Sequence, residues 1–215
     1  MMQDVVMHGA GNRFLLHFDN QDPTHLFKQH EHLDGVLVLS SGDEADIDML
    51  IINADGGFAE QCGNGLRCVA LHAVRSQVVT GPVVTIKTPS GINQCMVDVQ
   101  RNEVEVTFSE HLIGPTSCDV EQGDNSLPEL SYVSFGNPNA VLWTKDNPIE
   151  IRDALAEKIV YNPAFKEGMN LHVARLDGEN RAMCASWERG VGTTLASGTG
   201  GASVFVAAEV EGPFF

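Results

Sequence analysis

Basic residues are scarce in this sequence, with 13 Lys and Arg against 29 Asp and Glu and a formal net charge of -16. A nucleic-acid surface needs clustered Lys and Arg, so the composition argues against nucleic acid as a partner. Long apolar runs are also absent, because none approaches the roughly 18 residues that span a bilayer. The first residues lack the basic and apolar regions of a signal peptide. We therefore expect a cytoplasmic protein that has no membrane partner and binds a small molecule.

Cysteine patterns typical of disulfide-rich or zinc-binding folds are missing as well. The five cysteines form an odd set without C-x-x-C spacing, which argues against a disulfide framework and a structural zinc site. No G-x-G-x-x-G follows a predicted strand with an acidic residue about 20 positions later, so no dinucleotide-binding domain is indicated. The 215 residues and the apolar content of 43% fit one large globular domain or two small ones. The cysteines are Cys62, Cys68, Cys95, Cys118 and Cys184.

What the sequence does contain is a cysteine on a glycine-rich turn, directly before an apolar helical run. Cys62 is followed by Gly63, Asn64 and Gly65, and we expect a helix to begin at Gly63. Glycines let a ligand approach the backbone, and the N–H groups of a helix start can bind a carboxylate and favour a thiolate. The stretch therefore predicts a reactive cysteine. The alternative is an ordinary buried cysteine beside a loop.

The same design occurs a second time near the end of the chain. Ser197, Gly198, Thr199 and Gly200 lead into another apolar helical run. Two helix starts of one design indicate a duplicated unit whose halves face each other across one site. A carboxylate held between them would place its Cα between the side chains at positions 62 and 197.

Strand signals surround both helices, and each half is predicted to consist of strands wrapped on a central helix. Asn12 is expected on the turn of the first hairpin, and a short helix is expected over 24–28. Strand signals stop in the polar stretch 115–128, which predicts a boundary between the halves 1–115 and 116–215.

The two halves differ after their helices. Strands are predicted over 83–87, 95–99 and 103–108 after the first helix, whereas only residues 209–215 follow the second. By the repeat argument about three strands are missing there. A truncated chain, an abridged chain and a shortened natural form all remain open.

Taken together, six motifs in one order resemble the diaminopimelate epimerase family of cofactor-independent amino-acid racemases and epimerases. The resemblance runs from about His8 to Ala208. It implies an α/β fold of two pseudo-symmetric domains, each a β-barrel-like sheet wrapped around a central helix, with the active site in the cleft between them. The matching motifs are His8–Asn12, Asn53–Gly56, Cys62–Arg67, Gly136–Pro138, Glu167–Asn170, and Glu188–Gly190 with Gly198–Gly200.

The resemblance also implies the chemistry, which is epimerisation of LL-diaminopimelate to meso-diaminopimelate in lysine and cell-wall precursor synthesis. In such enzymes one cysteine thiolate removes the α-proton and a second thiol protonates the opposite face, without pyridoxal phosphate or metal. Cys62 matches one catalytic cysteine, and Ser197 stands at the position of the other. The expected partner is an amino-acid substrate, and a homodimer is left open. The residues that match substrate-binding positions are Asn12, Gly63, Asn64, Gly65, Asn137, Asn170, Glu188, Arg189, Gly198 and Thr199.

The sequence departs from the family at three points. Ser197 replaces a thiol by a far less acidic hydroxyl, Asn139 stands where a histidine more often follows Asn-Pro, and the final strands are absent. Ser197 is either an engineered substitution or a natural divergence. Two other functions therefore stay open: a one-base lyase of the same superfamily that uses Cys62, and an amino-acid-binding relative without turnover.

Overall fold

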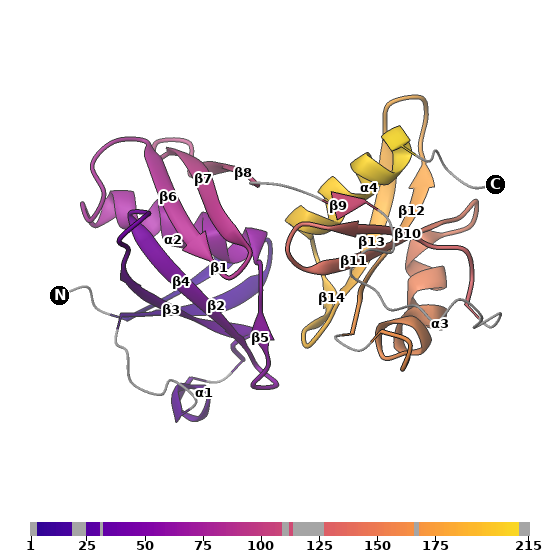
Figure 1. Ribbon diagram of the computed structural model, residues 1–215, viewed down its shortest axis with the longest axis horizontal. Coiled ribbons are helices and arrows are strands. Elements are labelled where there is room, and N and C mark those ends of the chain that lie inside the picture. The colour runs from indigo at the N-terminus through magenta and orange to yellow at the C-terminus, as the bar shows by residue number, and fades with distance from the viewer. Residues whose placement is uncertain are drawn as a thin grey trace. The chain divides into compact units, whose positions relative to one another are not determined.

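The computed structural model describes residues 4–18, 25–30, 32–108, 112–113, 127–165 and 168–210. The chain divides into two compact units, residues 1–110 and 111–215 (Figure 1). The boundary that we expected between residues 115 and 116 falls outside the described residues, as do Cys118 and Glu167.

The N-terminal unit is an eight-stranded sheet that curls around one helix, α2 (Gly63–Arg75). The strand order is β1-β2-β3-β4-β6-β7-β8, and β5 pairs with β4. Helix α2 contacts strands from both ends of this order, β1 and β2 at one end and β6, β7 and β8 at the other. The strands are β1 (Val5–Gly9), β2 (Asn12–His17), β3 (Gly35–Ser41), β4 (Ile47–Asn53), β5 (Phe58–Ala59), β6 (Val83–Thr88), β7 (Gly91–Asp98) and β8 (Glu103–Thr107).

The core of this unit lies between the sheet and α2. Leu16 and Leu37 point inward and pack in one cluster with Leu66 of the helix. Their neighbours Leu15 and Val36 belong to a separate cluster, which also contains Leu26 of the short helix α1 (Leu26–Gln29). Because successive side chains of a strand point to opposite faces, both faces of β2 and β3 are buried.

The C-terminal unit is a six-stranded sheet with a helix on each face. Its order is β14-β13-β12-β11-β10-β9. Leu171 and Val173 of β12 pack in one cluster with Ile159 of α3, whereas His172 between them lies against Gly200 of α4. The elements are β9 (Leu112–Ile113), β10 (Ser131–Ser134), β11 (Pro138–Trp143), α3 (Pro148–Val160), β12 (Asn170–Leu176), β13 (Ala182–Glu188), β14 (Gly192–Thr194) and α4 (Gly198–Val210).

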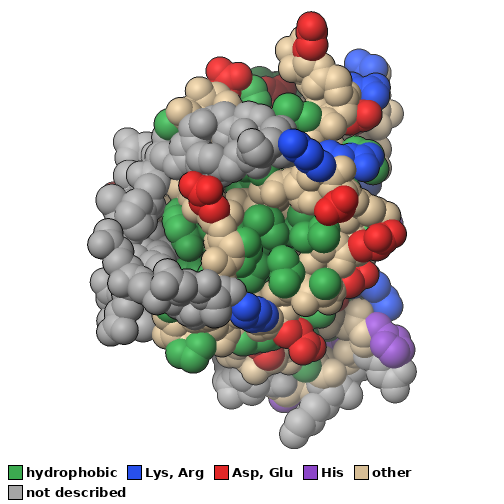
Figure 2. Space-filling view, turned by 90° about the vertical axis from the view of Figure 1, so that its right-hand side faces the viewer, with side chains coloured by type: hydrophobic (Ala, Val, Ile, Leu, Met, Phe, Trp, Pro, Cys, Tyr) green, Lys and Arg blue, Asp and Glu red, His purple; other side chains and the backbone are tan. Residues whose placement is uncertain are grey.

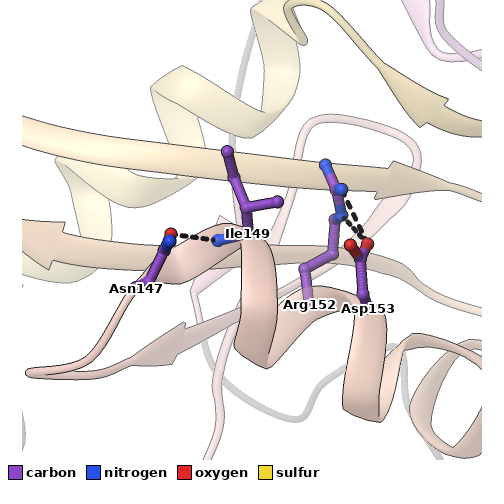
Figure 3. A network of polar contacts seen from close by, with 4 residues as sticks. All are labelled: Asn147, Ile149, Arg152 and Asp153. Atoms are coloured by element: carbon purple, nitrogen blue, oxygen red, sulfur yellow. Dashed lines mark hydrogen bonds and ion pairs between the residues drawn. The ribbon is translucent and has the colours of Figure 1, made fainter.

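Helix α3 begins with local capping chemistry. Asn147 is the N-cap, and its side-chain oxygen accepts a hydrogen bond from the Ile149 backbone N–H at 3.1 Å (Figure 3). Pro148 follows at the start of the helix, where its missing N–H is not needed. One turn later, Arg152 donates to Asp153 at 2.7 Å. The start of this helix is therefore specified by its own residues.

Both units share one sequence of elements and pairings. The order β1-β2-α1-β3-β4-β5-α2 is repeated as β10-β11-α3-β12-β13-β14-α4. In each, the first two strands pair antiparallel, the second and third pair parallel across the intervening helix, and the third, fourth and fifth pair antiparallel. This repeat confirms the predicted pseudo-symmetric α/β fold.

Local details differ from the sequence-based expectations. Asn12 is not on the turn but is the first residue of β2, paired with Gly9. Asn139 lies within β11. The first helix covers Leu26–Gln29 rather than 24–28. Strands β5, β9 and β14 were not predicted, because two or three residues are too few to show an alternating pattern.

Not all of the apolar surface is covered. On the C-terminal unit Leu195, Phe205 and Val210 are 89%, 66% and 58% exposed. Figure 2 shows one face of the molecule on which hydrophobic side chains gather, with acidic and basic side chains around them. In the described part of the chain, no helix is long and apolar enough to cross a membrane.

Candidate active site

Cys62 caps the N-terminus of α2. Its extended backbone, with φ -148° and ψ 96°, brings the thiol back over the first turn, where Sγ accepts from the Gly65 N–H at 3.3 Å. The Cys62 carbonyl accepts from the Leu66 N–H at 2.9 Å. A Cβ at position 65 would lie only 3.2 Å from Sγ, so glycine there lets the sulfur approach the backbone. The amide donor and the helix N-terminus both favour a thiolate at Cys62.

Asn12 and Asn64 form a buried pair beside Cys62. The Asn64 Nδ2 donates to Asn12 Oδ1 at 2.6 Å, and Arg67 donates to Asn64 Oδ1. The chain of β1 passes directly against the helix start, because a Cβ at Gly9 would lie 2.7 Å from the Asn64 carbonyl oxygen. The first hairpin and the start of α2 are thus joined by polar contacts around the cysteine.

Ser197 repeats the geometry of Cys62 at the start of α4. Its Oγ accepts from the Gly200 N–H at 3.1 Å, and its carbonyl accepts from the Gly201 N–H at 3.0 Å. These are the same two bonds, to the third and fourth residues onward, that Cys62 makes. A side-chain acceptor three residues before the donor amide is the usual N-cap arrangement.

A buried cluster of amides lies beside Ser197 and repeats the first hairpin's contact. Asn137 Nδ2 donates to Thr199 Oγ1 at 3.4 Å, as Asn64 bonds Asn12 in the other unit. Asn139 Nδ2 donates to the Asn137 carbonyl at 2.8 Å, and Asn139 Oδ1 accepts from Asn170 Nδ2 at 3.3 Å. The three asparagines are 7%, 1% and 7% exposed in chain order, so their amide groups are held by protein contacts.

Glu188 and Arg189 follow this cluster at the end of β13. The Arg189 N–H donates to Asn170 Oδ1 at 2.9 Å, and Thr194 Oγ1 donates to Glu188 Oε1 at 3.5 Å. The stem of Arg189 lies against Gly168, where a Cβ would be 2.8 Å from Cδ. Gly168 also has a φ of +71°, so position 168 favours glycine on both counts. The stem of Arg189 therefore passes directly over the backbone at Gly168.

The predicted site residues thus form two clusters, one at the start of each central helix. The N-terminal cluster contains Asn12, Cys62, Gly63, Asn64 and Gly65, and the C-terminal cluster contains Asn137, Asn170, Glu188, Arg189, Ser197, Gly198 and Thr199.

Sequence reasoning missed one member of the C-terminal cluster, His172. It is fully buried and contacts both Asn139 and Ser186. Burial lowers the pKa of its imidazole to about 4, so the ring is neutral at neutral pH. The available signal was a single polar residue within the otherwise apolar strand 171–174.

The remaining described cysteines differ from Cys62 in environment. Burial raises the pKa of the Cys68 thiol to about 11 and that of Cys95 to about 12. Neither takes part in the two clusters. In the described ranges, no group of three or more His, Cys, Asp or Glu side chains is arranged to hold a metal ion.

The comparisons with known proteins agree on one family. The family model described as diaminopimelate epimerase matches residues 5–111. A diaminopimelate epimerase from Sphingopyxis alaskensis is 33% identical over 221 residues, which cover 94% of this chain and 79% of that protein. One from Erythrobacter litoralis is 36% identical over 181 residues, covering 83% and 66%.

A solved structure supports the fold independently of close sequence similarity. A hydroxyproline epimerase from Agrobacterium vitis, with bound trans-4-OH-L-proline, superposes with a TM-score of 0.71 at 14% identity, covering 99% of this chain and 78% of that one. At this identity the likeness concerns the fold alone. From the sequence identity and coverage of its relatives, this chain belongs to the diaminopimelate epimerase family, a family of isomerases.

Proposed function

We propose that this protein epimerises diaminopimelate at Cα, with Cys62 as the acid–base group on one face of the substrate and Ser197 on the other. One observation carries this proposal: the two residues make the same pair of cap hydrogen bonds at matching positions of a repeated unit. Membership of the family supports the reaction and the cofactor-independent chemistry. As an enzyme of lysine and cell-wall precursor synthesis, it is expected in the cytoplasm.

The chemistry accounts for two helix starts. The α-proton of an amino acid is very weakly acidic, so the carbanion needs stabilisation as it forms. Fixed N–H dipoles at a helix N-terminus provide this without reorganisation. We assign the Cys62 thiolate to proton removal, since Gly65 and the start of α2 favour it. The carboxylates and ammonium groups of the substrate are assigned to Asn12, Gly63, Asn64, Gly65, Asn137, Asn170, Glu188, Arg189, Gly198 and Thr199.

Ser197 limits the reaction on the second face. A hydroxyl is far less acidic than a thiol and exchanges protons with a carbanion poorly. We therefore expect the protein to exchange the α-proton with solvent on the Cys62 face while inverting the centre slowly.

Exchange and inversion can be measured separately. The protein and its Ser197→Cys variant are incubated with LL- and meso-diaminopimelate in D₂O, and deuterium uptake and stereochemistry are followed. We expect inversion to rise by about 10²–10⁴-fold in the variant, the usual contribution of a positioned acid–base group. Cys62→Ser is the matched control: it should abolish exchange in the parent, whereas in the Ser197→Cys background it should leave exchange only on the face of position 197 and abolish inversion.

The same experiment separates the competing functions. A folded Ser197→Cys protein that neither exchanges nor inverts either isomer would overturn the epimerase proposal. The one-base lyase that a single thiol at Cys62 permits needs a leaving group on Cβ, which diaminopimelate lacks. It is tested in the same assay with a β-substituted amino acid such as serine, from which loss of the α-proton would expel water. Calorimetric binding without exchange would indicate a relative that binds amino acids without turnover.

A further inference from the structure

The donor and acceptor roles around His172 are determined by its partners. Nε2 lies 3.0 Å from Asn139 Oδ1, and Nδ1 lies 2.9 Å from Ser186 Oγ. The Asn139 amide has only one workable orientation, because its Nδ2 donates to the backbone carbonyl of Asn137. Its Oδ1 therefore faces His172 and can only accept, so Nε2 carries the proton and Nδ1 accepts from the Ser186 hydroxyl. The imidazole is held as a single neutral tautomer.

From His172 the hydrogen bonds lead outward to the C-terminal cluster. Asn139 connects the ring to Asn137, whose Nδ2 reaches Thr199, and to Asn170. Asn170 in turn accepts from the Arg189 backbone N–H at 2.9 Å. A change at the ring removes one of the two donors to Asn139 Oδ1, and Asn139 in turn contacts Asn137 and Asn170, so the change is passed on to assigned substrate-binding groups.

The ring also forms the floor under the first turn of α4. A Cβ on Gly200 would lie 2.3 Å from His172 Cε1 and 2.4 Å from Nδ1, so the helix backbone rests directly on the imidazole. Gly200 is the residue whose N–H donates to Ser197 Oγ. The ring thus sets the position of the amide that holds the Ser197 side chain.

The N-terminal unit has a different residue at the corresponding place. Leu37 lies two residues after Gly35 on β3, as His172 lies two residues after Asn170 on β12, and it pairs across to β2 as His172 pairs to β11. Its Cδ atoms lie 3.2 Å from the Cβ position of Gly65, the counterpart of Gly200. The same floor is therefore apolar in one unit and a hydrogen-bonded imidazole in the other.

We propose that His172 is a positioning residue of the active site, which acts through Asn139 on Asn137, Asn170 and Arg189, and through Gly200 on Ser197. This inference rests on the proposed function for its catalytic meaning. The hydrogen-bonded arrangement itself can be tested in the protein without substrate.

Three variants separate hydrogen bonding from packing. His172→Leu copies the apolar floor of the N-terminal unit and removes the donor to Asn139. His172→Gln keeps a donor and an acceptor. Ser186→Ala removes only the partner of Nδ1. In metal sites, residues that orient the ligating side chains are worth about 10–100-fold in affinity or activity. By analogy we expect a loss of that size for His172→Leu in kcat/KM of α-proton exchange.

The split between KM and kcat distinguishes positioning from general loss of structure. We expect His172→Leu to raise KM and to weaken calorimetric binding of diaminopimelate by the same factor, with the thermal midpoint within a few degrees of the parent. His172→Gln should recover binding to within about threefold of the parent, and Ser186→Ala should lose less than His172→Leu. Equal binding by the parent and His172→Leu, or a Gln variant as weak as the Leu variant, would overturn the proposal.

Nitrogen NMR of the ligand-free protein gives a readout that does not depend on substrate. The His172 ring should show a protonated Nε2 and an unprotonated Nδ1, and the side-chain amide signals of Asn137, Asn139 and Asn170 should all shift in His172→Leu. A protonated Nδ1, or unchanged amide signals, would overturn the assignment of His172 as a positioning residue. If the parent protein neither binds nor exchanges diaminopimelate, the proposed function fails, whereas the NMR result still decides the role of His172.

Discussion

The central helices of the two units start alike and continue differently. Leu66 and Ala70 of α2 are fully buried, and α2 packs against β6, β7 and β8 as well as against β1 and β2. Their counterparts in α4 are Gly201, which is exposed, and Phe205, which is 66% exposed. Helix α4 packs mainly against β10 to β13, and within the described residues no strand follows it.

This contrast separates the start of each central helix from the rest of that helix. The caps at Cys62 and Ser197 have the same hydrogen bonds even though only α2 is covered on its second side. The geometry of each helix start therefore does not require strands that follow the helix. The rest of the helix depends on whatever packs against it.

The largest expected effect concerns the residue under each helix start, which is His172 under α4 and Leu37 under α2. Gly200→Ala places a methyl carbon 2.3 Å from Cε1 of the fully buried His172 ring, whereas Gly65→Ala meets neighbours at 3.2 Å. We expect the free energy of unfolding to fall by about 3 kcal/mol or more for Gly200→Ala and by about 1 kcal/mol for Gly65→Ala. Gly201→Ala is the control, because nothing lies within 4 Å of its Cβ position and alanine favours a helix by about 1 kcal/mol. Urea denaturation that gave equal losses at positions 65 and 200 would contradict this difference.

His172 should give the C-terminal unit a pH-dependent stability. The pKa of His172 falls from 6.5 in the unfolded chain to about 4 in the folded protein because of burial. Above pH 6.5 the ring is neutral in both states and its contribution is complete. As the pH falls from 6.5 to 4, the unfolded state binds the proton more readily, so stability decreases, by up to about 3 kcal/mol, and then levels off.

The contribution of His172 is obtained as a difference between two proteins. Unfolding free energies of the parent and of His172→Gln are measured by urea denaturation between pH 7 and pH 4. Carboxylates and other histidines, including His72, contribute equally to both and cancel. A constant difference across this range would show that the ring does not titrate on unfolding.

Thiol reactivity should rank the cysteines by environment rather than by accessibility. We expect Cys62 to react with iodoacetamide at pH 7 about 100-fold or more faster than Cys68 or Cys95, because the raised pKa of each buried thiol leaves little thiolate. Cys184 tests the ranking further. The residue is exposed, yet its sulfur lies 3.8 Å from the Ser186 hydroxyl and desolvation raises the pKa of its thiol.

Peptide mapping by mass spectrometry gives the rate at each site, and diaminopimelate should protect Cys62. Labelling of Cys184 as fast as Cys62 would argue that access alone controls the reaction and would weaken the assignment of Cys62 as the base.

The smallest expected effect lies on the uncovered side of α4. Phe205→Gln should change the free energy of unfolding by less than about 0.5 kcal/mol, because the ring is mostly exposed. Ala70→Gln at the matching position of α2 should cost about 3 kcal/mol, since it forces a larger, polar side chain into a closed core. A large loss for Phe205→Gln would mean that the side chain is covered in solution.

The main features of the fold could be predicted from sequence because they depend on local patterns. Alternating apolar residues predict strands such as β8, and the glycine turns at Cys62 and Ser197 predict where α2 and α4 begin. Each cap bond joins residues three apart, so its geometry is contained in a short stretch of chain. The repeat of that stretch predicted the duplicated fold.

By itself, then, the sequence determined the two helix starts, their capping side chains and the replacement of a thiol by a hydroxyl at position 197. Tertiary structure decided which floor lies under each helix. Leu37 and His172 come from strands distant in sequence from their helices, and only parallel pairing of β2 with β3 and of β11 with β12 brings them beneath Gly65 and Gly200. The neutral tautomer of His172 has the same origin, because it requires burial and the opposing Asn139 oxygen, which strand pairing supplies and local sequence does not.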